Sequence, residues 1–148
     1  MRIIVFRTDR IGDLVLSTPA IRALREKFKR AYIGVCVDPS ARDVVAENPY
    51  VDEVILCEKN GKHKGVLGLL RFVRYLREKE FDTAVILHPT QRINLAAFLA
   101  GIPIRVGYDW KWGGLLTDKL VHRKQSGAKH ESEYTMDVVR RLGADPVD

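Results

Sequence analysis

Short apolar runs alternate along the chain with longer stretches in which apolar residues recur every three or four positions. Nearly continuous apolar runs are typical of parallel strands covered on both faces; they lie at residues 2–6, 33–37, 52–57, 83–87 and 104–107, with a weaker run at 119–122. The helical spacing between them predicts helices at residues 19–28, 40–47, 66–76, 94–100 and 131–142. The alternation therefore predicts an α/β fold with a doubly wound, mostly parallel sheet of about six strands.

Two of these helices allow more detailed predictions. Thr18 is the expected N-cap and Pro19 the first helical position of helix 19–28. Because proline lacks a backbone donor and crowds the preceding turn, Asp13 is expected in a separate, earlier turn. In the segment 66–76 one helical face carries only apolar residues and is expected to belong to the core; its members are Val66, Leu69, Leu70, Val73 and Leu76.

Length and composition limit the protein class. The 148 residues are expected to form a single domain, residues 1–148. The longest apolar runs are far shorter than the roughly 18 residues of a membrane span, and a strand directly after Met1 is no secretory signal, so a cytoplasmic location is expected. Cys36 and Cys57 lack metal-site or redox-motif spacing and are expected to be buried reduced thiols, without a disulfide or zinc.

Charge points to an anionic partner. The chain has 25 Lys and Arg against 19 Asp and Glu, a formal charge of +6. Nucleic acid, acidic lipid and a phosphorylated sugar all fit this excess. The basic residues are spread over helices that also carry Glu, so no nucleic acid is expected. A basic nucleic-acid-binding module, or another ligand-binding α/β module without catalysis, remains the alternative.

The turn after the first strand reads Arg7-Thr8-Asp9-Arg10-Ile11-Gly12-Asp13. In open α/β sheets, ligands bind beyond the carboxyl ends of the strands. A phosphate cradle needs several glycines and this turn has one, so a dinucleotide site or P-loop is not expected here. Its two carboxylates suit proton abstraction from a hydroxyl. Asp13 can also be a simple helix cap or dipole partner.

Three later loops should reach the same edge of the sheet. The loop after the third strand carries Lys59, Lys62 and Lys64, which either bind an anion or are only solvated. His88 and Arg92 follow the fourth strand, where a histidine such as His88 is more often an ordinary hydrogen-bonded residue than a catalyst. After the fifth strand come Tyr108, Trp110 and Trp112, and the tryptophans either stack on a sugar or cover the sheet edge. A receiver-like domain is disfavoured because the third strand ends in Leu56-Cys57-Glu58 without an aspartate.

Three segments resemble the family 9 glycosyltransferases, the lipopolysaccharide heptosyltransferases. Residues 10–25, RIGDLVLSTPAIRALR, are similar to the opening motif of that family. Residues 92–108, RINLAAFLAGIPIRVGY, are similar to its middle segment, and residues 130–143, HESEYTMDVVRRLG, to its interdomain helix. Together the three segments extend the resemblance over nearly the whole chain. Their shared order and spacing are hard to obtain by chance.

The resemblance implies a Rossmann-like domain that is one half of a GT-B architecture, with inverting transfer of heptose from ADP-heptose to inner-core lipopolysaccharide. It assigns the general base to Asp13. The acceptor would then contact the remaining candidates at the sheet edge, which are Asp9, Arg10, Thr18, Lys59, Lys62, Lys64, His88, Arg92, Tyr108 and Trp110. No metal or cofactor is expected, and the donor would bind a second domain that this chain lacks. The chain alone would then be inactive, with peripheral contact to the inner membrane through its anionic glycolipid acceptor.

Overall fold

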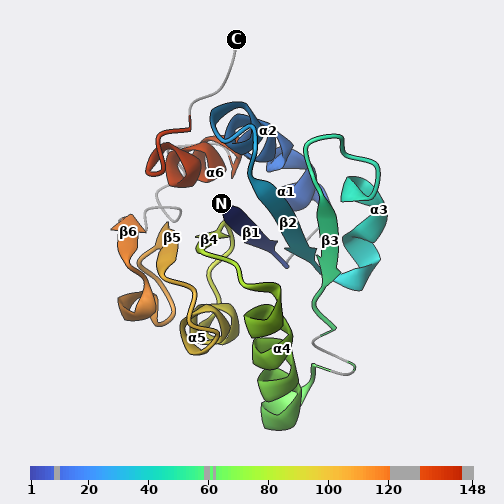
Figure 1. The fold of residues 1–148 in the computed structure, drawn as a ribbon, viewed down its shortest axis with the longest axis vertical. Helices are drawn as coiled ribbons and strands as arrows, with labels where there is room; N and C mark the ends of the chain where they lie inside the picture. The colour runs from blue at the N-terminus through green and yellow to red at the C-terminus, as the bar shows by residue number, and fades with distance from the viewer. Residues whose placement is uncertain (9–10, 59–60, 62, 121–130, 145–148) are drawn as a thin grey trace.

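The computed structural model describes residues 1–8, 11–58, 61, 63–120 and 131–144. Within these residues six strands form one all-parallel sheet in the order β3-β2-β1-β4-β5-β6 (Figure 1). The strands are β1 (Arg2–Arg7), β2 (Tyr32–Val37), β3 (Glu53–Leu56), β4 (Thr83–Ile86), β5 (Ile104–Tyr108) and β6 (Asp118–Leu120). This confirms the predicted Rossmann-like fold. The strand order reverses between β1 and β4, which places a topological switch point at their carboxyl ends.

Helices cover both faces of the sheet (Figure 1). One face is covered by α1 (Ile11–Leu16), α2 (Thr18–Lys27), α3 (Arg42–Val45) with the preceding 3-10 turn η1 (Pro39–Ala41), and α6 (Glu131–Arg140). The other is covered by α4 (Gly65–Lys79) and α5 (Gln91–Leu99), and the 3-10 turn η2 (Gly113–Leu115) follows β5. Successive residues of β1 point to opposite faces, so Ile3 and Val5 join the first core cluster, and Ile4 and Phe6 the second.

The first helix begins differently from the prediction. A separate helical turn does precede Pro19, but the N-cap position belongs to Ser17 and Thr18 is already helical, so the prediction for Thr18 was wrong by one residue. The Thr18 hydroxyl donates to the Val15 carbonyl at 2.8 Å. That carbonyl would have accepted from residue 19, whose proline nitrogen carries no hydrogen. The Thr18 hydroxyl thus supplies the hydrogen bond to the Val15 carbonyl that Pro19 cannot donate.

The predicted apolar stripe of α4 is core only in its second half. Val73 and Leu76 are buried, as expected, but Val66 is 75% and Leu70 52% exposed, so for these two the prediction was wrong. The buried line runs instead through Gly68, Phe72 and Leu76. The physical reason is position, because the first turns of α4 extend past the rest of the molecule (Figure 1).

The remaining predictions need only small corrections. Helix α5 begins at Gln91, before the predicted residue 94, because the Thr90 side chain caps it by accepting from the Ile93 nitrogen at 3.0 Å. The short third helix is η1 followed by α3, and β6 ends at Leu120, with residues 121 and 122 outside the described residues. Cys36 and Cys57 are buried, and burial together with the Cys57 thiol raises the pKa of Cys36. No helix in the described ranges is both long and apolar enough to cross a membrane.

A polar network fastens the amino-terminal edge of the sheet. Lys79, at the end of α4, donates to Glu53 Oε2 at 2.6 Å, and the Tyr32 hydroxyl donates to Glu53 Oε1 at 2.8 Å. Burial by itself raises the pKa of Glu53, but these hydrogen bonds outweigh it and lower the pKa below the ordinary 4.5. The hydrogen bond to Glu53 likewise raises the pKa of Lys79.

Glu53→Gln is expected to lower the free energy of unfolding by about 1 kcal/mol at neutral pH. Because the folded pKa of Glu53 is lowered, its contribution is present above pH 4.5 and disappears as the pH falls through that lower folded value. Urea unfolding as a function of pH should therefore show a shallower acid decline for the variant. The control is Glu78→Gln, because Glu78 and its partner Arg74 are 66% and 84% exposed. Equal losses in the two variants would contradict the prediction.

Candidate functional site

The candidate loops all leave the same edge of the sheet. Because all six described strands run parallel, their carboxyl ends lie together, and the loops after β1, β3, β4 and β5 follow from that edge. This placement was predicted and is confirmed for the residues the structure describes. Asp9, Arg10, Lys59 and Lys62 lie outside the described residues. The site is therefore built below from the remaining side chains.

An arginine–carboxylate pair occupies the switch point. Arg7 ends β1 and is buried, and its Nη1 donates to the Leu87 carbonyl at 3.1 Å, just beyond β4. Its Nη2 lies 3.6 Å from Asp13 Oδ2 in the first turn of α1. The Asp13 side chain keeps 30% of its surface exposed. The pair joins β1, the end of β4 and α1, and it holds a carboxyl group that solvent or a substrate can still reach.

The surface beside Asp13 is open. A Cβ added to Gly12 would meet no described atom within 4 Å apart from its chain neighbours. Glycine in an exposed helix costs about 1 kcal/mol relative to alanine, so folding alone does not explain a glycine here. Ile11, Val15 and Leu16 of the same helix are also exposed. The helix that carries Asp13 thus presents free space and apolar side chains at the carboxyl edge.

Arg92 connects two of the four loops. Its Nη2 donates to the carbonyls of His63 and Gly65, the latter at 3.0 Å, and so ties the first turn of α5 to the start of α4. His63 is buried, with its Nδ1 accepting from the Glu58 nitrogen at 3.0 Å and its ring 5.0 Å from that of Phe72. Arg92 therefore orders the end of the lysine loop. Lys64 stays exposed at the N-cap position of α4.

Two other candidates have internal partners that suggest a structural role. The Tyr108 side chain is buried, and its hydroxyl donates to the Tyr134 carbonyl at 2.7 Å, which fastens α6 to the sheet. The Thr18 hydroxyl donates to the carbonyl of Val15 in the preceding helix α1, as described above. We therefore leave Tyr108 and Thr18 out of the proposed acceptor contacts. His88 is partly buried directly after Leu87, next to the pair of Arg7 and Asp13.

A buried asparagine shapes the aromatic loop. Asn94 of α5 donates through Nδ2 to the carbonyls of Trp110 at 3.2 Å and Lys111 at 2.9 Å. Lys111 and Trp112 have positive φ angles of 46° and 67°, a conformation that non-glycine residues adopt only when their surroundings impose it. Trp110 and Trp112 remain 41% and 54% exposed. Asn94 thus holds the loop so that both tryptophans face solvent.

Sequence patterns did not reveal the structural roles of Arg7, His63 and Asn94 at this edge. Arg7 and Asn94 donate to backbone carbonyls that lie far away in the sequence, and the His63 carbonyl accepts from the distant Arg92 side chain. The only available signal was the occurrence of a charged or polar residue beside apolar ones. Within the described residues, no group of three His, Cys, Asp or Glu side chains is placed to hold a metal ion.

Comparison with known proteins finds relatives that are described as glycosyltransferases. No family model matches the chain. A Haemophilus influenzae protein described as a glycosyltransferase is 26% identical over 141 residues, which cover 94% of this chain and 40% of that protein. Lipopolysaccharide heptosyltransferase 2 of Escherichia coli K12 is 29% identical over 127 residues, covering 85% of this chain and 36% of that protein.

Solved structures agree with these relatives. The family 9 glycosyl transferase of Veillonella parvula superposes with a TM-score of 0.84 at 26% identity, covering 97% of this chain and 42% of that one. ADP-heptose lipopolysaccharide heptosyltransferase II of E. coli superposes with a TM-score of 0.77 at 28% identity. The match covers 94% of this chain and 40% of that one. The resemblance to family 9 glycosyltransferases is thereby confirmed. The chain spans about 40% of the length of the relatives it matches.

Proposed function

We propose that this chain is the acceptor-binding half of a glycosyltransferase that transfers heptose from ADP-heptose to the inner core of lipopolysaccharide. The relatives named as heptosyltransferases support this assignment, and so does the share of their length that the chain covers. The observation that carries the proposal is the Asp13 carboxylate, fixed by buried Arg7 at the switch point and still accessible. The donor would bind the part of such a transferase that this chain does not contain.

In the proposed reaction Asp13 acts as general base. Its carboxylate accepts the proton of an acceptor hydroxyl while that oxygen attacks the anomeric carbon of the donor, and the ADP phosphate leaves with the electrons of the broken bond. A single displacement inverts the anomeric configuration and needs no carboxylate nucleophile. Because a carboxylate is a weak base at neutral pH, alignment and exclusion of water must supply much of the effect. The contact with Arg7 provides the alignment.

The acceptor is proposed to lie across the carboxyl edge from α1 to the aromatic loop. The carboxylates and phosphates of the acceptor would meet Arg10 in the turn after β1. They would also meet Lys59, Lys62 and Lys64, which belong to the basic loop after β3. Trp110 offers an exposed ring for stacking on a sugar, and Asp9 and His88 can bind hydroxyl groups. Arg92 contributes indirectly, by ordering the segment that leads to Lys64.

Calorimetric titration of the isolated chain tests the division of roles. The chain should bind a phosphorylated inner-core oligosaccharide weakly but measurably. It should bind neither ADP nor ADP-heptose with micromolar affinity, because the turn after β1 lacks the glycines that cradle a pyrophosphate. Asp13→Asn serves as a control that should leave glycan binding nearly intact. Micromolar binding of either nucleotide would make this edge a donor site and overturn the acceptor-binding assignment.

A further inference from the structure

The outer side of the α4–α5 layer exposes an unusual number of large apolar side chains. Val66 and Leu67 in the first turn of α4 are 75% and 72% exposed, and Leu70 follows one turn later. Phe98 and Leu99 are exposed near the end of α5. Single exposed apolar residues are common, but three in the first two turns of α4 form a group that marks a contact surface. The first turns of α4 also form the lowest part of the molecule in Figure 1, where they project into solvent.

The helix α5 links the start of α4 to the aromatic loop. Arg92 ties the start of α5 to the start of α4 through the His63 and Gly65 carbonyls, so the two helices form one unit at that end. A pocket of about 400 Å³ then lies between α5 and the loop after β5, lined by Leu95, Trp112, Gly114 and Leu115. Its lining is almost wholly apolar. Trp112 stands at its edge with more than half of its surface exposed.

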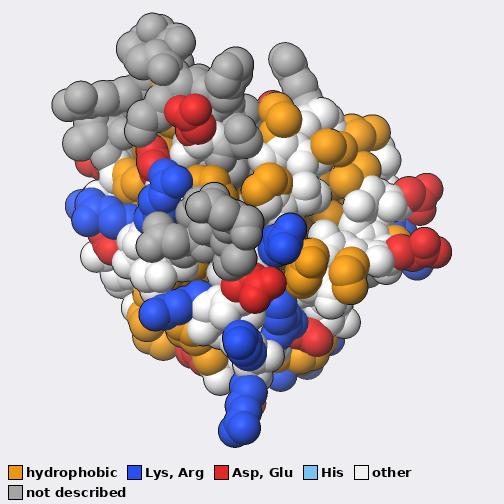
Figure 2. Space-filling view, turned by 90° about the horizontal axis from the view of Figure 1, so that it is seen from above, with side chains coloured by type: hydrophobic (Ala, Val, Ile, Leu, Met, Phe, Trp, Pro, Cys, Tyr) orange, Lys and Arg blue, Asp and Glu red, His pale blue; other side chains and the backbone are white. Residues whose placement is uncertain are grey.

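The same part of the chain carries the entire net charge. Residues 59–112 contain ten Lys and Arg and four Asp and Glu, a formal charge of +6, whereas the other residues contain fifteen of each sign. No acidic residue occurs in 61–77 or in 83–108. The opposite end of the molecule is different, because basic and acidic side chains are intermixed there (Figure 2). The excess of positive charge in this segment is not visible in any single helix, because its basic residues come from several helices, strands and loops.

We propose that the α4–α5 layer is a docking surface for a phospholipid bilayer that contains anionic lipids. Val66, Leu67 and Leu70 enter the interfacial region, where burial of aliphatic groups is favourable. Trp112 takes the interfacial depth that suits an amphipathic ring, and exposed Lys64, Arg71 and Arg74 meet anionic headgroups.

The apolar tip distinguishes a bilayer from the other polyanions. A nucleic acid is bound through cations along its backbone and aromatic platforms under its bases, so exposed valine and leucine at a helix tip contribute nothing to that contact. A soluble phosphosugar uses the cations alone. Of these three polyanions, only a lipid surface uses both the aliphatic side chains and the surrounding positive charge. The inference does not depend on the transfer reaction, because it concerns lipid affinity and not turnover.

Sedimentation with vesicles tests this surface on the chain as it exists. Binding is expected to vesicles of phosphatidylcholine and phosphatidylglycerol in equal parts, with a blue shift of tryptophan fluorescence, and to be much weaker with phosphatidylcholine alone. Val66→Ser with Leu67→Ser should weaken partitioning by about tenfold for each residue replaced, since each aliphatic side chain that leaves water contributes roughly that factor. Arg71→Glu with Arg74→Glu should weaken it by at least about fivefold for each charge lost.

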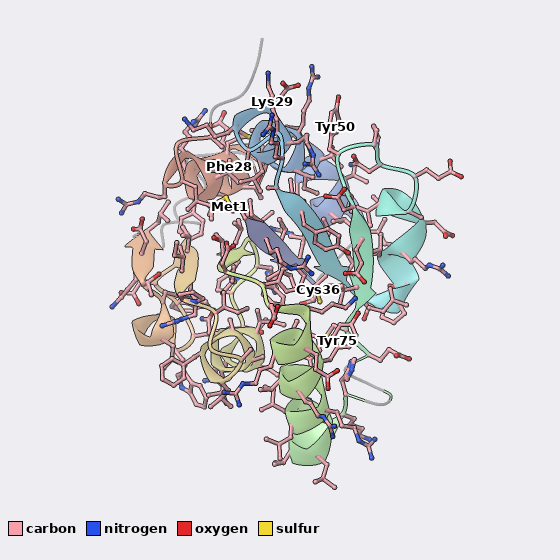
Figure 3. The ribbon with its side chains drawn as sticks, viewed as in Figure 1. Met1, Phe28, Lys29, Cys36, Tyr50 and Tyr75 are labelled. Atoms are coloured by element: carbon pink, nitrogen blue, oxygen red, sulfur yellow. The ribbon has the colours of Figure 1, made fainter. Side chains whose placement is uncertain are left out.

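Matched controls lie at the other end of the molecule. Lys29 is exposed at that end (Figure 3), so Lys29→Glu changes the net charge without touching the α4–α5 layer and should leave most of the binding. Val66 and Leu67 are exposed, so the serine variant should unfold at the same urea concentration as the wild type. Equal vesicle binding by the serine variant and the wild type would overturn the proposal. So would salt-sensitive binding of an oligonucleotide without vesicle binding.

Discussion

Asp13→Asn is expected to lower turnover by about 10²-fold or more in a two-domain enzyme that carries this chain, with little change in acceptor binding. A general base contributes about 10²–10⁴-fold, and an amide cannot accept the proton. A suitable enzyme joins this chain to the remainder of E. coli lipopolysaccharide heptosyltransferase 2, which the chain matches over 36% of its length. Steady-state kinetics with ADP-heptose and an inner-core acceptor would separate kcat from KM.

Asp9→Asn is the matched control, because it removes the other carboxylate of the same turn. It should leave kcat within a fewfold of the wild type. If Asp9→Asn is instead the damaging change, the base has been assigned to the wrong carboxylate. Asparagine at position 13 retains an oxygen that can accept from Arg7, so urea unfolding should show that the variant is folded. Near-normal turnover by Asp13→Asn would remove Asp13 from the proposed role.

The fold could be predicted because its signals are local. The first five strands of the described sheet are short apolar runs, and helical spacing follows each of the first four, so this alternation can be read in windows of a few residues. The carboxyl edge follows from that alternation, because parallel strands end together. This is why the positions of Asp13, His88 and Trp110 at one edge were predicted correctly.

The contacts that complete the edge could not be predicted in the same way. Arg92 was expected to bind an acceptor, but its guanidinium donates to carbonyls 27 and 29 residues earlier in the chain. Asn94 was only part of an apolar-rich helix, yet its amide shapes the loop at Trp110 and Lys111. Such side chain–backbone bonds depend on tertiary packing, and no periodicity encodes them.

The prediction that the whole apolar stripe of α4 belongs to the core was wrong for a related reason. Helical spacing identifies which residues share a face, but it does not say how far the helix extends past the sheet. Leu76 lies over the sheet and is buried, whereas Val66 belongs to the projecting end. An apolar residue there has a different meaning, because it faces solvent or a partner and not the core. The exposed half of the stripe is what led to the proposed bilayer contact.

Gly68→Ala is expected to lower the free energy of unfolding by about 2–3 kcal/mol, although alanine is ordinarily the better helix former. A Cβ on Gly68 would lie 2.6 Å from the His63 carbonyl oxygen and 2.7 Å from its Cα. These are backbone atoms, so no side-chain rotation relieves the overlap. The segment around His63 must then leave α4 and lose its contact with Phe72 and its hydrogen bonds to Glu58 and Arg92.

Gly61→Ala is the control for this prediction, since it adds the same methyl group to the loop that packs against Gly68. The nearest atom to its Cβ would be the Glu58 Cβ at 3.6 Å, an ordinary van der Waals distance, so stability should change by no more than about 0.5 kcal/mol. Urea unfolding measures both variants, and hydrogen exchange should show faster exchange at residues 61–68 in Gly68→Ala alone. Equal stabilities would mean that His63 does not pack over Gly68. In that case Arg92 would lose its proposed role in ordering the loop that leads to Lys64.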